Sequence, residues 1–93
     1  MAALEGTITA TGTTATLEIA GTFNLSLSGF GSANVDLERS INGTDWGIVE
    51  SFTADAEKTG ECAGACLFRF NCTSYTSGTI KYVVSKYEYG RSY

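Results

Sequence analysis

The feature that most constrains this chain is a period-two alternation of apolar and polar side chains along almost its whole length. Phe23, Leu25 and Leu27 share one parity, and the residues between them are polar. The same alternation recurs in residues 35–41, 46–52, 66–72 and 80–84. Because successive side chains of a strand face opposite sides, this pattern predicts strands with one buried face and one wet face.

Turn-forming residues interrupt the alternation at short intervals. The interruptions fall at Gly12, Gly21, Gly29, Gly31, Asn42, Gly43, Ser77 and Gly78. About seven to eight short antiparallel strands at such spacing predict an all-β fold, a small antiparallel β-sandwich of the immunoglobulin-like or jelly-roll type. We expect residues 1–86 to form a single β-sandwich domain and residues 87–93 to form a tyrosine-rich C-terminal tail.

The strongest hairpin signal is the dipeptide Asn42-Gly43. Both residue types tolerate positive φ, which a two-residue type I′ turn requires at both central positions. Residues 35–41 and 46–52 are therefore predicted to be the two arms of a hairpin that this turn connects.

Strand parity also predicts which side chains enter the core. Arg39 has the same parity as Val35 and Leu37, so we expect a buried guanidinium that needs an acceptor, either Asp55 or backbone carbonyls. The aromatic side chains at core parity are Phe23, Trp46, Phe52, Phe68, Phe70 and Tyr82. We expect these aromatic residues to pack in the interior, and a sugar-binding platform is the less favoured alternative.

The composition speaks against several classes of function. The chain has no histidine, so a Ser-His-Asp or Cys-His site is impossible and the commonest general base is missing. Asp36 and Glu38 share one strand face, which we expect to be solvated. The sequence therefore predicts that the protein is not an enzyme and uses no cofactor.

Charge and hydropathy limit the kinds of partner that the chain is expected to bind. A net charge of −4 without a basic run disfavours nucleic acid, whose binding depends on clustered Lys and Arg. No stretch of about 20 apolar residues is present, so no membrane span is expected. The N-terminal residues lack a charged region followed by a long apolar region, so we do not expect a secretory signal.

Three cysteines, Cys62, Cys66 and Cys72, lie within a short stretch. A structural zinc site needs four ligands, and the C-x₂-C spacing of zinc ribbons and redox motifs is absent. On one strand Cys66 and Cys72 would lie roughly 20 Å apart, too far for a bond. Three alternatives remain: a Cys62–Cys66 bridge around residues 63–65, a bridge to another chain, and free thiols. We expect no metal.

Three tyrosines, Tyr87, Tyr89 and Tyr93, lie in the last seven residues. A tyrosine side chain combines a rigid apolar ring with a polar tip, which suits contact with another protein surface. We expect this tail to act as a docked arm.

Residues 37–58, LERSINGTDWGIVESFTADAEK, resemble small β-sandwich structural proteins from the virions of tailed bacteriophages. In those proteins one strand ends in an R-S-x-[DN]-G-x-x-W hairpin, and a later core strand carries an arginine. The matching residues here are Arg39, Ser40, Asn42, Gly43, Trp46, Thr53, Asp55 and Arg69, and residues 75–86 also fit. The S-x-[DN]-G-x-x-W portion also resembles the Asp-box hairpin of sialidase propellers, which is a structural element.

The resemblance implies a non-enzymatic structural protein of a tailed-phage virion, above all a capsid decoration or cement protein that stabilises the head. The alternatives are a neck, collar or tail accessory protein and a carbohydrate- or receptor-binding module. The implied partners are the phage major capsid protein or other virion proteins, with a homo-oligomer on the particle. The implied location is the virion, after synthesis in the bacterial host cytoplasm.

Overall fold

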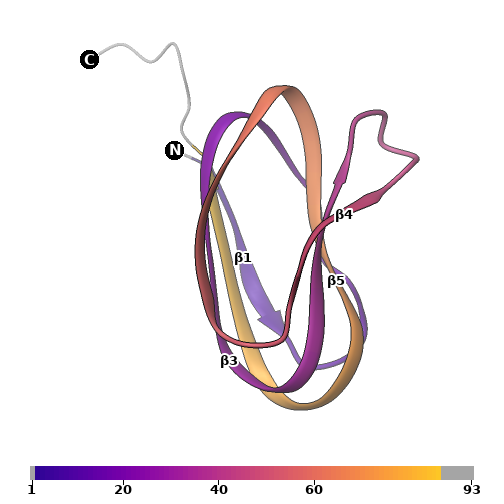
Figure 1. Cartoon of the computed structure of the whole chain (residues 1–93), viewed down its shortest axis with the longest axis vertical. Coiled ribbons are helices and arrows are strands. Elements are labelled where there is room, and N and C mark those ends of the chain that lie inside the picture. Colours follow the sequence, from indigo (N-terminus) through magenta and orange to yellow (C-terminus); the bar gives the residue numbers. More distant parts are fainter. Residues whose placement is uncertain (1, 87–93) are drawn as a thin grey trace.

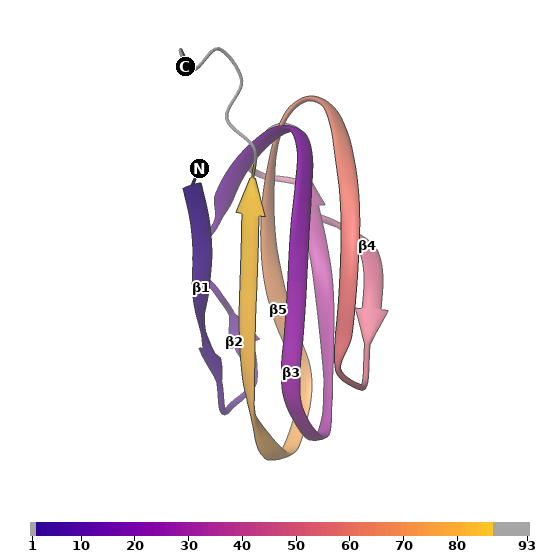
Figure 2. The same ribbon diagram turned by 90° about the vertical axis from the view of Figure 1, so that its left-hand side faces the viewer.

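The computed structural model describes residues 2–86, which form an all-β, antiparallel structure (Figure 1). The strands are β1 (Ala2–Ile8), β2 (Gly12–Thr13), β3 (Leu17–Ser40), β4 (Gly47–Phe52) and β5 (Ala56–Lys86). Their order is β1-β5-β3-β4, with β2 paired to β5. Figure 2 shows the strands lying side by side along the long axis of the molecule. The predicted all-β class is confirmed.

The two long strands, β3 and β5, turn back on themselves at the ends of the molecule (Figure 1). Residues 23–27 of β3 pair with residues 56–60 of β5 on one side and with residues 82–86 on the other. The second half of β3, residues 30–40, pairs with residues 67–78. Residues 2–86 therefore form five strands and not the seven to eight short ones that were predicted, because each long strand continues through its bends.

A close approach of two backbones determines one of these bends. Gly29 has φ +85°, a left-handed conformation that favours glycine. A Cβ built at Gly29 would overlap the carbonyl oxygen of Thr79 in the neighbouring bend of β5. Glycine is therefore required at position 29 for two reasons: the positive φ value and the lack of room for a Cβ atom.

The core contains the side chains that the alternation predicted to be buried. The fully or nearly buried apolar residues are Ile8, Ile19, Phe23, Leu25, Leu27, Val35, Leu37, Phe52, Cys62, Cys66, Phe68, Phe70, Cys72, Ile80, Tyr82 and Val84. Phe70 and Tyr82 pack with ring centroids 5.3 Å apart, and Phe23 and Phe68 with centroids 5.0 Å apart. Tilted aromatic pairs at such distances add to the stabilisation from burial. Of the six aromatics expected inside, all except Trp46 are buried.

Tyr87, Tyr89 and Tyr93 lie outside the described residues, so their role as arm contacts stays a prediction. Between residues 2 and 86 the structure holds no helix with the length and apolar character needed to cross a bilayer.

We predict that Gly29→Ala lowers the free energy of unfolding by about 1–3 kcal/mol, because the methyl group meets backbone and the φ value is strained. The matched control is Gly47→Ala, where a Cβ has no neighbour within 4 Å and φ is not left-handed. The control is expected to change stability by less than about 0.5 kcal/mol. Urea denaturation followed by circular dichroism measures both, and equal losses would contradict the close approach.

Candidate functional site

The predicted hairpin between residues 35 and 52 exists, but its turn differs from the prediction. The last pair of the β3–β4 ladder is Arg39 with Gly47, so residues 41–46 form a longer connection. Among residues 2–86 every residue with positive φ is a glycine, and Gly43 has φ +83° while Asn42 does not. The type I′ prediction is wrong because such a turn needs positive φ at both central residues.

The side chain of Asn42 organises this connection instead. Its Oδ1 accepts hydrogen bonds from the backbone amides of Thr44 and Asp45, each at 2.9 Å. Its Nδ2 donates to Asp45 Oδ2 at 2.9 Å. Ser40 Oγ accepts from the Gly43 amide at 2.7 Å and donates to Asn42 Oδ1 at 3.2 Å. Asn and Ser side chains stabilise turns in this way, so these motif residues have a structural role.

Trp46 does not enter the core, which corrects the parity prediction. Its side chain is only half-buried, and the guanidinium of Arg69 lies 4.0 Å from the centre of its ring. Arg69 Nε also donates a hydrogen bond to Glu38 Oε1 at 2.8 Å. A cation over an indole face and a charge-assisted hydrogen bond both favour this arrangement. Trp46 thus connects the loop to a charged pair on the sheet.

The expectation of a solvated acidic face is also wrong. Asp36 is 4% exposed and Glu38 is 8% exposed. Asn71 Nδ2 donates to Glu38 Oε2 at 3.1 Å, and Asn34 Nδ2 donates to Asp36 Oδ1 at 2.9 Å. The alternation along the sequence could not reveal this burial, because it depends on the polar side chains that lie beside the two carboxylates: Asn34, Arg69 and Asn71. The two acidic side chains on this face therefore have hydrogen-bonded partners within the sheet.

Arg39 is exposed, so the predicted buried guanidinium is wrong. It is the penultimate residue of β3, where the core ends and a long side chain reaches water. Asp55, the acceptor expected for it, instead accepts a hydrogen bond from the Phe30 amide at 3.1 Å.

A hollow of about 500 Å³ opens beside the hairpin. Its lining residues, here called the hairpin patch, are Arg39, Ile41, Asn42, Asp45, Trp46, Gly47, Ile48 and Val49. Three of them are the large apolar residues most exposed in the described chain: Ile41 at 77%, Ile48 at 62% and Val49 at 51%. Figure 1 shows the loop standing away from the body beside β4.

A β-bulge explains why Ile48 lies outside the core. Leu37 pairs with Glu50, whereas Glu38 pairs with Ile48, so Val49 is an extra residue in β4. An extra residue changes the parity of everything before it, and Ile48 therefore leaves the core face that Phe52 occupies. No sequence signal marks the bulge. Ile41 lies beyond the end of β3.

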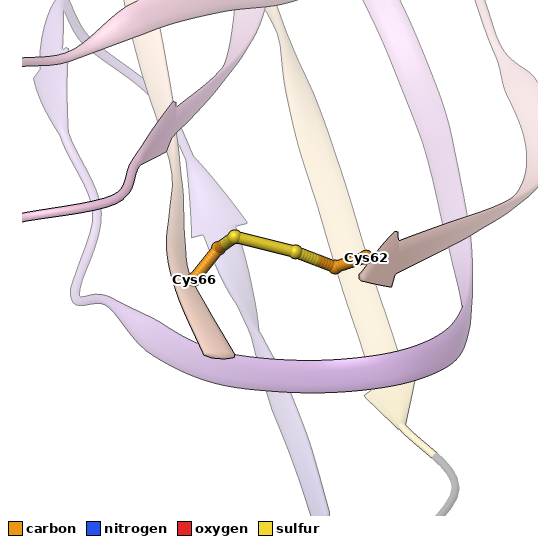
Figure 3. The surroundings of a disulfide bond; sticks show 2 residues. All are labelled: Cys62 and Cys66. Atoms are coloured by element: carbon orange, nitrogen blue, oxygen red, sulfur yellow. A yellow bond between two sulfur atoms is a disulfide. The ribbon is translucent and has the colours of Figure 1, made fainter. Parts of the chain in front are cut away.

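The cysteines follow the first of the three alternatives. Cys62 and Cys66 form a disulfide across residues 63–65, with Cα atoms 6.9 Å apart (Figure 3). They pair with Gly21 and Ile19 of β3, where the register also shifts, so the bridge closes the bend of β5 at a matching corner. Within residues 2–86 no cluster of three or more candidate metal-binding side chains occurs.

Cys72 is a buried free thiol. Its Sγ donates to the Ser74 carbonyl at 3.3 Å. Burial raises the pKa of this thiol, and the Ser74 hydrogen bond opposes the rise only in part. Since the thiolate is the reactive form, Cys72 is expected to be inert while the protein is folded.

Comparisons with known proteins bear on the fold alone. No protein-family model matches the chain, and no curated protein sequence matches it. A similar solved structure is that of a mitogen derived from Yersinia pseudotuberculosis, with a TM-score of 0.57 and 14% sequence identity. The match covers 97% of this chain and 88% of that one. At this identity the likeness extends to the all-β architecture and carries no function across.

We predict that Arg69→Ala lowers the free energy of unfolding by about 1–3 kcal/mol, because the nearly buried Glu38 carboxylate loses its cation. Trp46 should become more mobile, which a change in its fluorescence reports. The control is Lys58→Ala, which removes an exposed ion pair with Glu50 at 3.2 Å and should cost less than about 1 kcal/mol. Similar losses in the two variants would contradict the role of the Arg69–Glu38 pair.

We also predict the number of reactive thiols. In the absence of reductant, the folded chain should react with no thiol reagent, and the unfolded chain should react at Cys72 alone. Prior reduction should add Cys62 and Cys66. Mass spectrometry after alkylation counts the modified cysteines, and three modified cysteines without reductant would contradict the disulfide.

Proposed function

We propose that this chain is a non-enzymatic structural protein of a tailed-phage virion, and specifically a decoration protein that stabilises the head by binding the major capsid protein. The observation that carries the proposal is the hairpin patch, where Ile41, Ile48 and Val49 are exposed together. Contiguous exposed apolar side chains on a small domain indicate a surface used for protein contact. The alternative within the virion is a neck, collar or tail accessory protein.

The proposal includes a finer description of the fold, a jelly roll. The pairing register groups residues 2–8, 80–86, 23–28 and 56–62 into one layer, and residues 12–19, 66–72, 33–40 and 47–52 into a second. The chain changes layer at almost every connection, as jelly rolls do and immunoglobulin-like folds do not. The thickness of 17 Å suits two layers packed about 10 Å apart. Capsid proteins and lectins both use this fold, so the fold does not decide between them.

A receptor- or carbohydrate-binding module is the second candidate. It is favoured by the position of Trp46 beside Asn42 and Asp45 in one hollow. Against it, both polar atoms of the Asn42 side chain and Oδ2 of Asp45 already form hydrogen bonds within the loop, and Arg69 covers one face of the indole. A sugar needs a free aromatic face and free polar groups, so protein contact fits the patch better.

The test is the composition of phage particles purified from a host that carries the gene. We predict that the protein is present in many copies and fractionates with heads. Incorporation should be lost for Val49→Lys and kept for Thr9→Lys, an exposed position near β1 at the opposite end of the strand order. Presence only in the tail fraction would favour the accessory role. Absence from particles, together with binding to a glycan array, would favour the second candidate.

A further inference from the structure

We propose that the hairpin patch binds a second copy of this chain, with β4 of one molecule against β4 of the other about a twofold axis. This inference deepens the proposed function. The role of the dimer in a phage particle rests on that function. It does not depend on that function for the dimer itself.

The first argument is that β4 is an exposed edge strand with apolar side chains. It lies at the end of the strand order, and within residues 2–86 it pairs with β3 alone. Its sequence, GIVESF, contains neither lysine nor proline, the residues that commonly block an edge. Its first five residues are exposed, so both faces and the free edge of the strand are open. The bulge at Val49 interrupts the ladder to β3, but it leaves two β-branched apolar side chains outside.

The second argument is the distribution of charge. The hairpin patch contains Arg39 and Asp45, and the adjacent Glu50 is neutralised by Lys58 at 3.2 Å. These four residues are two of the six basic and two of the ten acidic side chains in the sequence, so their charges cancel. The net charge of −4 therefore lies on the rest of the chain. Two copies of an acidic protein repel each other least where their contact surfaces are neutral.

The third argument is self-complementarity. A twofold interface brings the same surface of each copy together, so the surface must offer both halves of every contact. The patch offers apolar side chains at the centre of β4, with a cation at Arg39 and an anion at Asp45 around the same hollow. Arg39 and Asp45 both lie near the Gly47 end of β4, so a twofold axis at Val49 leaves them outside the central contact and places Val49 opposite Val49 and Ile48 opposite Glu50. An axis at Val49 also avoids placing Glu50 opposite Glu50, which would be unfavourable.

The experiment uses the full chain in sedimentation velocity over a range from low to high micromolar concentration. The wild-type protein is expected to double in mass as concentration rises. Val49→Lys should remain a monomer throughout, because it places two lysines opposite each other at the axis. Thr9→Lys is the matched control and should dimerise as the wild type does. Circular dichroism checks that each variant is folded.

A crosslinking measurement decides the matter if Val49→Lys fails to fold. Val49→Cys should form a disulfide-linked dimer under mild oxidation, whereas Thr9→Cys should not. The wild type is its own control, because its free thiol, Cys72, is buried. A dimer that persists in Val49→Lys, or Thr9→Cys crosslinking as well as Val49→Cys, would place the contact elsewhere and overturn the inference.

The outcome also separates this inference from the proposed function. A wild-type chain that stays monomeric at every concentration, yet enters particles through the hairpin patch, would overturn the dimer. It would leave the virion role intact, with another virion protein on the patch. A dimer that depends on Val49 in a protein absent from particles would support the dimer and overturn the virion role.

Discussion

The bends in β3 and β5 are the constraint on which the rest of the structure depends. Each long strand must leave one set of neighbours and join another, and this is possible only where the backbone can turn sharply. Gly29 provides such a place beside Thr79, and the Cys62–Cys66 bridge closes another opposite the register shift between Ile19 and Gly21. Because the bends bring distant segments together, the core side chains of every segment converge on one interior.

The hairpin patch is a consequence of the same architecture. β3 ends at Ser40, and the chain must return along β4 at the edge of the sheet, where one side has no partner strand among the described residues. The loop is held by Asn42 and Ser40 from within, and by Trp46 on Arg69 from the side. A loop held in this way presents Ile41 and Ile48 on a rigid base. Rigid presentation lowers the entropy lost on binding, which suits a contact surface.

Sequence patterns predicted the core well and the patch poorly. Phe23, Leu25 and Leu27 were assignable because a regular strand obeys strict alternation, and all three are buried. Ile48 was misassigned because one extra residue at Val49 reverses parity for the part of β4 that precedes it, and Trp46 was misassigned because it lies in the loop of residues 41–46 and not in a strand. The Cys62–Cys66 bridge was foreseen as one of three alternatives, since spacing limits which sulfurs meet but does not choose among them.

The sequence by itself determined the all-β class, the set of core side chains in regular segments, the presence of a hairpin at residues 35–52 and the lack of histidine chemistry. These properties depend on local alternation and residue type, which do not require distant contacts. Only the tertiary structure decided that Asp36 and Glu38 are buried, that Arg39 is exposed and that Trp46 lies over Arg69. The environment of a polar side chain depends on its neighbours in space, and those of Glu38 and Trp46 come from β5, far along the chain.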